Sequence, residues 1–275
     1  MIRMLGLIRL LIVVLLGLGL ALPGAPAAAA MAPSPPEADL PRLFEGALQA
    51  SRQGDFERAL PLWDQVLAVA PGDAAAWSNR GNVRLALGDA VAAIADQTRA
   101  IELDPLSADP HLNRGTAEEA LQRWDAAAAD YNWILERHLE AGEPRASALY
   151  NLGNVQGSRG DWAAARASFA AAAEARPGFA MARSSAALSS FELGDLPAAE
   201  RELRNLIRRY PLFVDARAAL TALLWRQGSR GEAESHWAAA SGLDPRYRQP
   251  EWLLSVRRWP PVPIEALQQF LALAG

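Results

Sequence analysis

The sequence predicts an all-α fold, a solenoid of six helix-turn-helix repeats followed by a C-terminal capping helix. Three observations predict it. Side chains of the same kind return every 34 residues, Ala is abundant while β-branched residues are sparse, and Gly-Asp pairs and Pro recur at fixed places. A fixed period of this length indicates units that bury their apolar faces against neighbouring units. The Ala-rich composition favours helix over strand.

Rows of 34 residues that start at Leu40 place small and large side chains in fixed columns, with four extra residues in the third row. Two helices that cross closely need small side chains at the crossing point, and large side chains then fill the space between stacked pairs. Column 20 holds Ala59, Ala93, Ala127, Ala165, Ala199 and Ala233; column 8 holds Ala47, Gly81, Gly115, Gly153, Ala187 and Thr221; column 24 includes Trp63, Tyr131, Phe169 and Trp237.

Most rows also carry signals for the ends of two helices. A Gly-Asp pair in the middle of a row is expected to stop the first helix, A, and to cap the second helix, B, through the Asp side chain. A Pro near the end of a row cannot continue helix B. The pairs are Gly54-Asp55, Gly88-Asp89, Gly160-Asp161 and Gly194-Asp195, and the prolines are Pro71, Pro105, Pro177, Pro211 and Pro245.

This period and these columns resemble the tetratricopeptide repeat. Row two, from AAAWSNRGN to IELDP, and row four, from ALYNLGN to ARP, are similar to ordinary members of that family. The resemblance implies a right-handed superhelical solenoid with repeats at 40–73, 74–107, 108–145, 146–179, 180–213 and 214–247. Only row two has the family's aromatic residue at column 4, as Trp77; the other rows have Leu43, His111, Leu149, Arg183 and Arg217 there.

Two segments depart from the repeat. The extra residues within 139–145 predict a lengthened loop or an extra helical turn between the third and fourth repeats. Residues 248–275 are expected to cap the last repeat, with the amphipathic stretch 265–273 covering its apolar face. Within this cap, Arg257-Arg258-Trp259 is either an interface hot spot or, as we favour, a stack of Arg on Trp.

The N-terminal 30 residues are predicted to be a secretory signal peptide. Arg3 and Arg9 precede an apolar run of 13 residues, Leu10 to Leu22, and Ala28-Ala29-Ala30 offers a cleavage site. The alternative is a retained membrane anchor, although a span needs about 20 apolar residues. Residues 31–39 contain three prolines and are predicted to form a linker.

Export to the periplasm or the thylakoid lumen follows from a signal peptide. The C-terminal segment, with its Trp-Pro-Pro sequence, is similar to that of exported, lumen-targeted tetratricopeptide repeat proteins of cyanobacteria and plastids. That resemblance implies partners in photosynthetic membrane complexes. Contact with a membrane is expected only if the N-terminal segment is retained.

Composition and motifs argue against catalysis. The chain has no Cys and no Lys, and its three His are far apart. It also lacks a Gly-rich phosphate loop, an HExxH motif and a GxSxG motif. We therefore expect no enzyme activity, cofactor, metal site or small-molecule substrate. The net charge of −4 argues against binding to nucleic acid. His111, at a column that packs in the family, is expected in the core. An enzyme subunit remains a third possibility only if another chain supplies the chemistry.

The resemblance implies that A helices line a concave groove, and this places the candidate site. The predicted partner-binding residues are Asn79, Asn82, Asn113, Thr116, Tyr150, Asn151 and Asn154. Asn at column 6 in three consecutive rows forms a ladder of amides, which suits the backbone of an extended peptide. The alternative is an ordinary solvated face without a ligand. The end rows of the groove are more apolar, with Phe44 and Leu48 at one end and Leu188, Phe191 and Trp225 at the other.

The residues present argue against one function known in the family. Members that grip a C-terminal carboxylate use two Asn and several basic residues. Asn82 and Asn113 match the two Asn, but Ser78, Ser147 and Asn151 stand where bases are required. The function expected is a non-catalytic scaffold that binds segments of other proteins. The alternative is a membrane-tethered structural or envelope-assembly protein with an uncleaved N-terminal helix.

Overall fold

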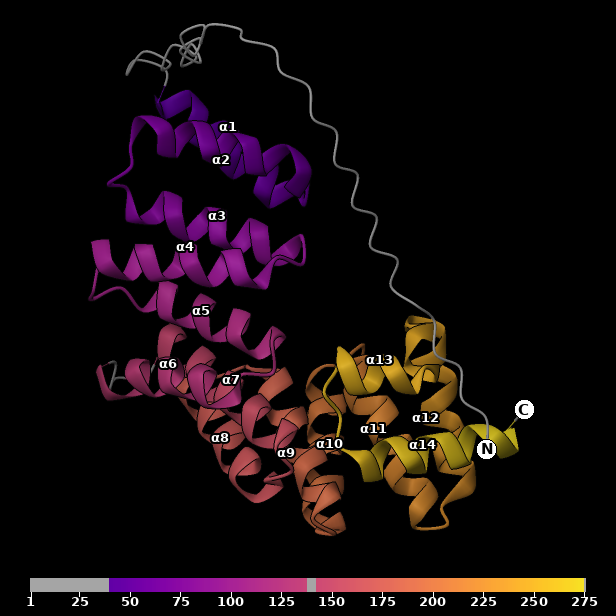
Figure 1. Ribbon diagram of the computed structural model, residues 1–275. Coiled ribbons are helices and arrows are strands. Elements are labelled where there is room, and N and C mark those ends of the chain that lie inside the picture. The colour runs from indigo at the N-terminus through magenta and orange to yellow at the C-terminus, as the bar shows by residue number, and fades with distance from the viewer. Residues whose placement is uncertain (1–39, 138–141, 275) are drawn as a thin grey trace, which may run out of the picture. The chain divides into compact units, whose positions relative to one another are not determined.

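A computed structural model describes residues 40–137 and 142–274, and this part of the chain is all-helical. The helices follow each other in pairs along the chain (Figure 1). The predicted signal peptide and linker, 1–30 and 31–39, lie outside the described residues. Among the described helices, none combines the length and hydropathy that a membrane span requires.

Six A helices alternate with six B helices, and each helix packs mainly against its neighbours in sequence. The A helices are α1 (Leu40–Gln53), α3 (Ala74–Ala86), α5 (Ala108–Ala120), α7 (Glu143–Ser158), α9 (Ala180–Glu192) and α11 (Val214–Arg226). The B helices are α2 (Phe56–Val69), α4 (Ala90–Leu103), α6 (Trp124–Arg137), α8 (Trp162–Ala175), α10 (Leu196–Arg209) and α12 (Arg230–Leu243).

The turn between A and B helices has the predicted form. Gly at column 15 adopts a positive φ, and the Asp that follows accepts a hydrogen bond from a backbone N–H in the first turn of helix B. These four bonds are 3.0 to 3.3 Å long. In the third repeat Gln122 takes the glycine's place and still has a φ of 56°.

The crossing of each helix pair depends on the small residue at column 8. A Cβ added to Gly81 would lie 2.7 Å from the Gln97 amide, and one added to Gly115 would lie 2.6 Å from the Tyr131 ring. The same holds for Gly153, where the Phe169 ring is 2.7 Å away. Column 8 therefore needs a small residue at the helix crossing, as predicted, and the column 24 side chain that it faces belongs to the same repeat.

Repeats two and three also contain buried ion pairs. Asp96 accepts two hydrogen bonds from Arg80, at 2.7 and 2.9 Å, and Asp130 accepts two from Arg114 in the same arrangement. His111 is buried, as predicted. Its ring stacks on Trp133 at 3.7 Å and its Nδ1 lies 2.8 Å from Asp130. Burial lowers the pKa of His111, so the neutral ring donates its Nδ1–H to the carboxylate.

The insertion after the third repeat lengthens an A helix. Helix α7 has 16 residues, whereas α3, α5, α9 and α11 have 13 each. It begins at Glu143, inside the segment predicted to carry the extra residues, so the predicted additional helical turn is found there. Residues 138–141 of that segment lie outside the described residues.

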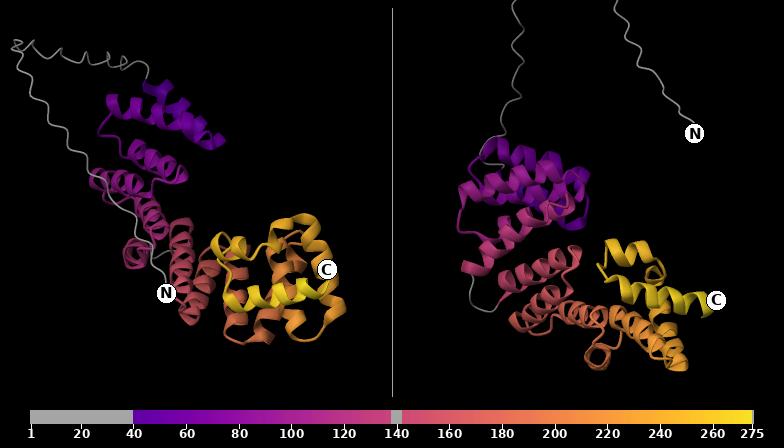
Figure 2. Two further views of the ribbon diagram at one scale, coloured as in Figure 1. Left: turned by 45° about the vertical axis from the view of Figure 1, so that its right-hand side comes forward. Right: turned by 60° about the horizontal axis from the view of Figure 1, so that its bottom comes forward.

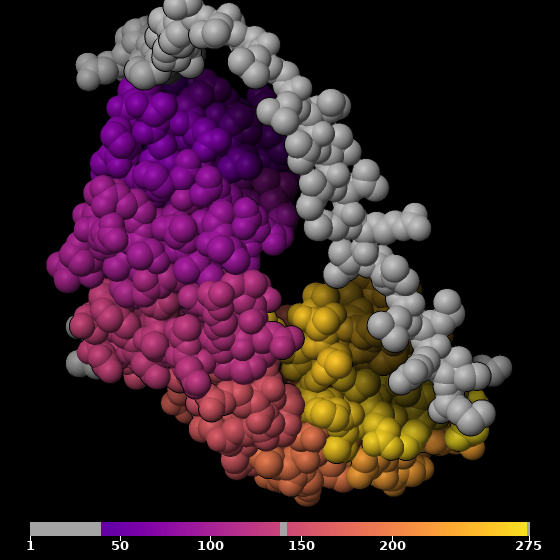
Figure 3. Space-filling view, in the orientation of Figure 1, coloured from indigo at the N-terminus to yellow at the C-terminus, as the bar shows by residue number. Residues whose placement is uncertain are grey.

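The segment after the sixth repeat contains a 3-10 turn (Pro245–Arg248), α13 (Pro250–Ser255) and α14 (Pro261–Ala274). Helix α14 lies along α11 and α9, and both views of Figure 2 agree with this contact. It buries Ala266, Leu267 and Phe270. The space-filling view shows the yellow segment against the orange last repeats (Figure 3).

The predicted C-terminal capping helix is present, and the surface that it covers extends beyond the last repeat. Helix α14 covers mainly the A-helix side of repeats five and six, whereas we expected the end face of the last repeat. The physical reason is the apolar surface that the A helices of these two repeats offer for burial. Leu188, Phe191 and Trp225 form an apolar stripe on α9 and α11, and α14 packs against it. The C-terminal helix thus occupies the A-helix face of these two repeats.

Candidate functional site

Three of the predicted residues meet in one pocket between α3 and α5. Asn79, Asn82 and Asn113 line this pocket, which has a volume of about 360 Å³. Ser78, Ser107, Asp104 and Asp109 are among its other lining residues. The first part of the amide ladder is therefore a continuous polar surface across two repeats.

The amides of this pocket keep hydrogen-bonding groups free. Gln97 donates to the Asn82 side-chain oxygen at 3.0 Å, which leaves the Asn82 NH₂ unused. Asn113 donates to the Ser78 hydroxyl at 3.2 Å, which leaves its carbonyl oxygen unused. Among the described residues, none hydrogen-bonds the Asn79 side chain. The pocket thus offers both donors and acceptors to a ligand.

On α7, Asn151 and Asn154 are half-buried, and neither side chain hydrogen-bonds to another described residue. They are on the third A helix of the ladder. Tyr150, beside them in sequence, has a different environment. Its ring packs against Phe169 at 5.4 Å and Phe179 at 5.1 Å, and burial raises the pKa of its hydroxyl.

The predicted residues therefore differ in accessibility. Thr116 is exposed on α5, and its hydroxyl donates to the Leu112 carbonyl at 3.0 Å. Tyr150 serves mainly the packing between repeats, because the two rings around it come from α8 and from the residue before α9. The ladder that the structure presents consists of the Asn side chains.

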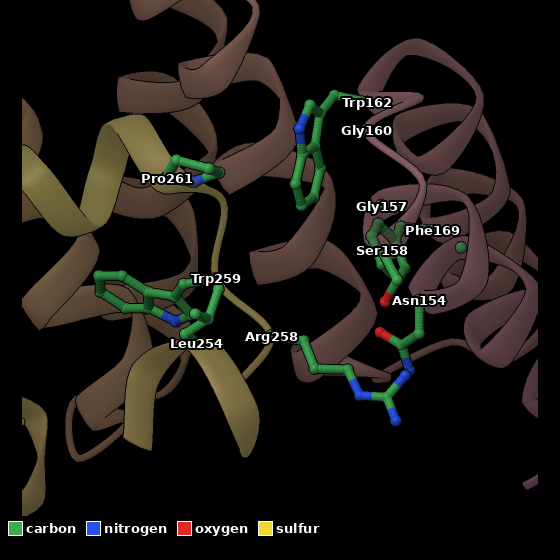
Figure 4. A pocket seen from close by; sticks show the side chains of 11 residues that line it. Asn154, Gly157, Ser158, Gly160, Trp162, Phe169, Leu254, Arg258, Trp259 and Pro261 are labelled. Atoms are coloured by element: carbon green, nitrogen blue, oxygen red, sulfur yellow. The ribbon is translucent and has the colours of Figure 1, made fainter. Parts of the chain in front are cut away.

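A second pocket, of about 280 Å³, lies where the C-terminal segment meets the fourth repeat (Figure 4). Asn154 is the predicted residue that lines it. The others come from α7, α8, the turn between these helices and residues 254–261, and sequence reasoning missed them as a site. They are Gly153, Gly157, Ser158, Gly160, Trp162, Phe169, Leu254, Arg258, Trp259 and Pro261.

The C-terminal segment is held in place by the Asp215 carboxylate on α11. Asp215 is 1% exposed and accepts hydrogen bonds from the Ser184 and Tyr247 hydroxyls, at 2.6 and 3.0 Å. The Trp259 indole N–H donates to it at 3.0 Å. Arg257 donates through Nε at 3.0 Å and through Nη2 at 2.8 Å. Such a buried charge needs this many partners to offset its desolvation.

Two further carboxylates hold the same segment. Glu119 on α5 forms an ion pair with Arg258 and also accepts a hydrogen bond from the Tyr131 hydroxyl. Glu192 on α9 accepts from the Val262 backbone N–H at 2.7 Å. Residues 257–262 are therefore tied to three different A helices.

The favoured reading of Arg257-Arg258-Trp259 was wrong. Both arginines pair with carboxylates on other helices, and Trp259 is buried as a hydrogen-bond donor. The sequence did contain a signal for this, because Asp215 is the one acidic residue of α11, a helix in which most other residues are apolar.

The chemistry of these surfaces is hydrogen bonding and apolar contact. Within residues 40–137 and 142–274, no group of three or more His, Asp or Glu is placed to hold a metal ion. His111 points its Nδ1 to Asp130 inside the core, and its Nε2 is buried without a partner among the described residues.

Comparison with known proteins identifies the repeat. The tetratricopeptide repeat family model matches residues 44–108, 112–180 and 184–248. The Protein SGT1 homolog of Oryza sativa subsp. japonica is 35% identical over 75 residues, which are 27% of this chain and 20% of that protein. The chain thus aligns with about a fifth of this relative's length.

Solved structures share the fold at low identity. The structure of PilF from Pseudomonas aeruginosa has a TM-score of 0.65 at 17% identity, and the match covers 76% of this chain and 93% of that one. YrrB, described as a TPR protein with an unusual peptide-binding site, has a TM-score of 0.51 at 18% identity, with 66% and 92% covered. With the family model matching most of its length, the chain belongs to the tetratricopeptide repeat family.

Proposed function

We propose that this protein is a non-catalytic scaffold that binds an extended peptide segment of a partner protein along α3, α5 and α7. One observation carries the proposal. Asn79, Asn113 and Asn151 stand at the same position of three successive A helices, and each has an amide oxygen or nitrogen that no other described residue uses. An Asn amide can pair with a backbone amide through its donor and its acceptor.

The location of α14 supports the same surface. It fills the A-helix face of repeats five and six, so the A-helix face of the earlier repeats, with its Asn side chains, is the part that α14 leaves for a ligand. The peptide-binding site named for YrrB is consistent with a peptide ligand for this family. At 18% identity, however, that likeness supports the fold, and the ligand rests on the amide ladder.

The test replaces Asn79, Asn113 and Asn151 together by Ala in the full chain. Partner proteins are captured from native extract, and overlapping synthetic peptides that cover their sequences are made. The affinity of each peptide for the protein is then measured by calorimetry. Three lost hydrogen bonds, at about 0.5–1.5 kcal/mol each, predict an affinity about 10-fold to 2,000-fold weaker. Unchanged affinity for every captured peptide would refute the proposal.

A matched control uses amide side chains of B helices. Gln65, Asn132 and Asn205 lie on α2, α6 and α10, away from the A-helix face. Their replacement by Ala removes the same number of amides and is expected to leave peptide affinity within about twofold, since surface substitutions have small effects.

The site of action is a separate part of the proposal. We propose export through a signal peptide cleaved near Ala30 to the periplasm or thylakoid lumen, with partners in photosynthetic membrane complexes during their assembly or maintenance. The order of positive, apolar and small residues supports cleavage. The mass of the protein isolated from its native cells tests this. A chain that retains residues 1–30 in the membrane fraction would favour the anchored, envelope-assembly alternative.

A further inference from the structure

We propose that the pocket between α7, α8 and residues 254–261 receives one large apolar side chain, of the Leu or Phe type, from the peptide bound in the groove. This inference rests on the proposed function, and it adds a chemical requirement to the ligand. Figure 4 shows Trp162 and Phe169 on the side of the fourth repeat and Leu254, Trp259 and Pro261 on the side of the C-terminal segment.

The size of the pocket suits a side chain. Its volume of about 280 Å³ lies just below the ~300–1,000 Å³ of sites that enclose whole small molecules. A cofactor would not be enclosed, whereas the anchor residue of a peptide would fit. Such anchors in pockets supply much of the affinity in many interfaces.

The walls of the pocket are apolar because two of its helical positions lack side chains. Gly153 and Gly157 expose α7 to the rings behind them. A Cβ at Gly157 would lie 2.6 Å from Trp162, and one at Gly153 would lie 2.7 Å from Phe169. The aromatic rings occupy the space that side chains at these positions would take, and they form an apolar wall.

The charge of the pocket favours a neutral anchor. Arg258 is the one charged residue among the described residues that line it, and its ion pair with Glu119 balances that charge. A carboxylate or a cation entering the pocket would lose its hydration without gaining an unpaired counterion. A Leu or Phe side chain loses no such hydration and gains from burial of its apolar surface.

The rim of the pocket offers hydrogen bonds to the peptide backbone. The Nε–H and one Nη group of Arg258 have no partner among the described residues, and neither does the Asn154 amide. Asn154 also belongs to the predicted ladder, so the pocket continues the surface along which the peptide is proposed to run. Leu254, 59% exposed, extends the apolar rim.

The test uses three probes on the unmodified full chain: the N-acetyl methylamides of leucine, aspartate and arginine. Each is titrated while the indole N–H signal of Trp162 is followed by NMR, with Trp162→Phe identifying that signal. We expect the leucine probe to shift the signal in a saturable way, with at least tenfold tighter binding than the two charged probes. Equal binding of all three, or no saturable shift with leucine, would overturn the inference.

A variant that fills the pocket gives a second readout. Ser158, exposed at the end of α7, lines the pocket, and Ser158→Phe places a ring in it. Ser235→Phe is the matched control, because Ser235 is exposed on α12 and does not line the pocket. Leucine-probe binding should weaken at least tenfold in the first variant and stay within twofold in the second. Equal binding in both variants would refute the pocket as the site.

The two proposals fail separately. If the triple Asn variant loses its partner peptides and the leucine probe does not bind, the pocket inference is refuted and the proposed function stands. If the leucine probe behaves as expected while the triple Asn variant binds every peptide normally, the pocket binds apolar side chains without the amide ladder.

Discussion

The Asp215 carboxylate offers the sharpest test of how the C-terminal segment is held. Replacing Asp215 by Asn keeps the shape of the side chain but removes its negative charge. Arg257, whose side chain is 16% exposed, then stays in the interior without a counterion. Burial lowers the pKa of Arg257, but the adjacent carboxylate more than offsets this and holds the pKa above its ordinary range, so the arginine remains charged.

The expected loss of stability follows from that stranded charge. Removing one partner of a buried ion pair typically costs about 3–5 kcal/mol. Asn still accepts hydrogen bonds from Ser184, Tyr247 or Trp259, so a value near the lower limit, about 3 kcal/mol, is expected. Adding Arg257→Met to Asp215→Asn should recover part of the lost stability, because the buried arginine without a counterion is then removed.

Denaturant unfolding followed by far-ultraviolet circular dichroism measures the loss, and hydrogen exchange locates it. Protection should fall in α9, α11 and α14, which meet around this site, and should be unchanged in α1 and α2. Asp125→Asn is the matched control, since Asp125 is exposed and pairs with the exposed Arg159, so about 0–1 kcal/mol is expected. Equal losses below 1 kcal/mol in both variants would refute the role assigned to Asp215.

Three further predictions concern the repeats. Gly115→Ala should destabilise the protein by about 1–3 kcal/mol, because its methyl group would clash with the Tyr131 ring. Gly46→Ala should stabilise it by about 0.5–1 kcal/mol in the same denaturation assay, because the nearest atom of a neighbouring helix would lie 4.0 Å from the added methyl group. Gln122→Gly should raise the free energy of unfolding by up to about 1 kcal/mol, because glycine adopts the positive φ of this position without the steric cost that glutamine bears. A lower free energy of unfolding would contradict this. Burial lowers the pKa of His111 below 6.5, so the unfolded chain binds more protons and stability should fall as pH drops through 6.5; a thermal melting series between pH 7 and pH 5 should be flatter for His111→Phe.

The fold could be predicted because every signal for it is local and repeated. A Gly-Asp pair sets a turn and a cap within a few residues, and six rows allow a single unusual residue to be recognised. Gln122 shows this well. It lacks the glycine of the other rows, yet the pattern around it placed the turn correctly.

The site could be predicted only in part. The position of a residue within the repeat indicates the helix face on which it lies, but not which side chains of other elements surround it. Asn79 and Asn113 line one pocket, but the Tyr150 ring is covered by Phe169 and Phe179 from later elements. The second pocket depends on residues 254–261. This segment has no repeat to be compared with, and its contact with Glu119 spans 139 residues of sequence.

That long contact has a consequence for how the protein folds. In an ordinary repeat array each unit contacts its neighbours alone, and folding can spread from any point. Here residues 257–262 are bonded to α5, α9 and α11, so the later repeats share contacts that are distant in sequence. Contacts between residues so far apart in the sequence form slowly during folding. During synthesis the first two repeats can form early, while α9 and α11 keep an apolar stripe uncovered until α14 has been made. The second half of the chain should therefore fold late and as one cooperative unit.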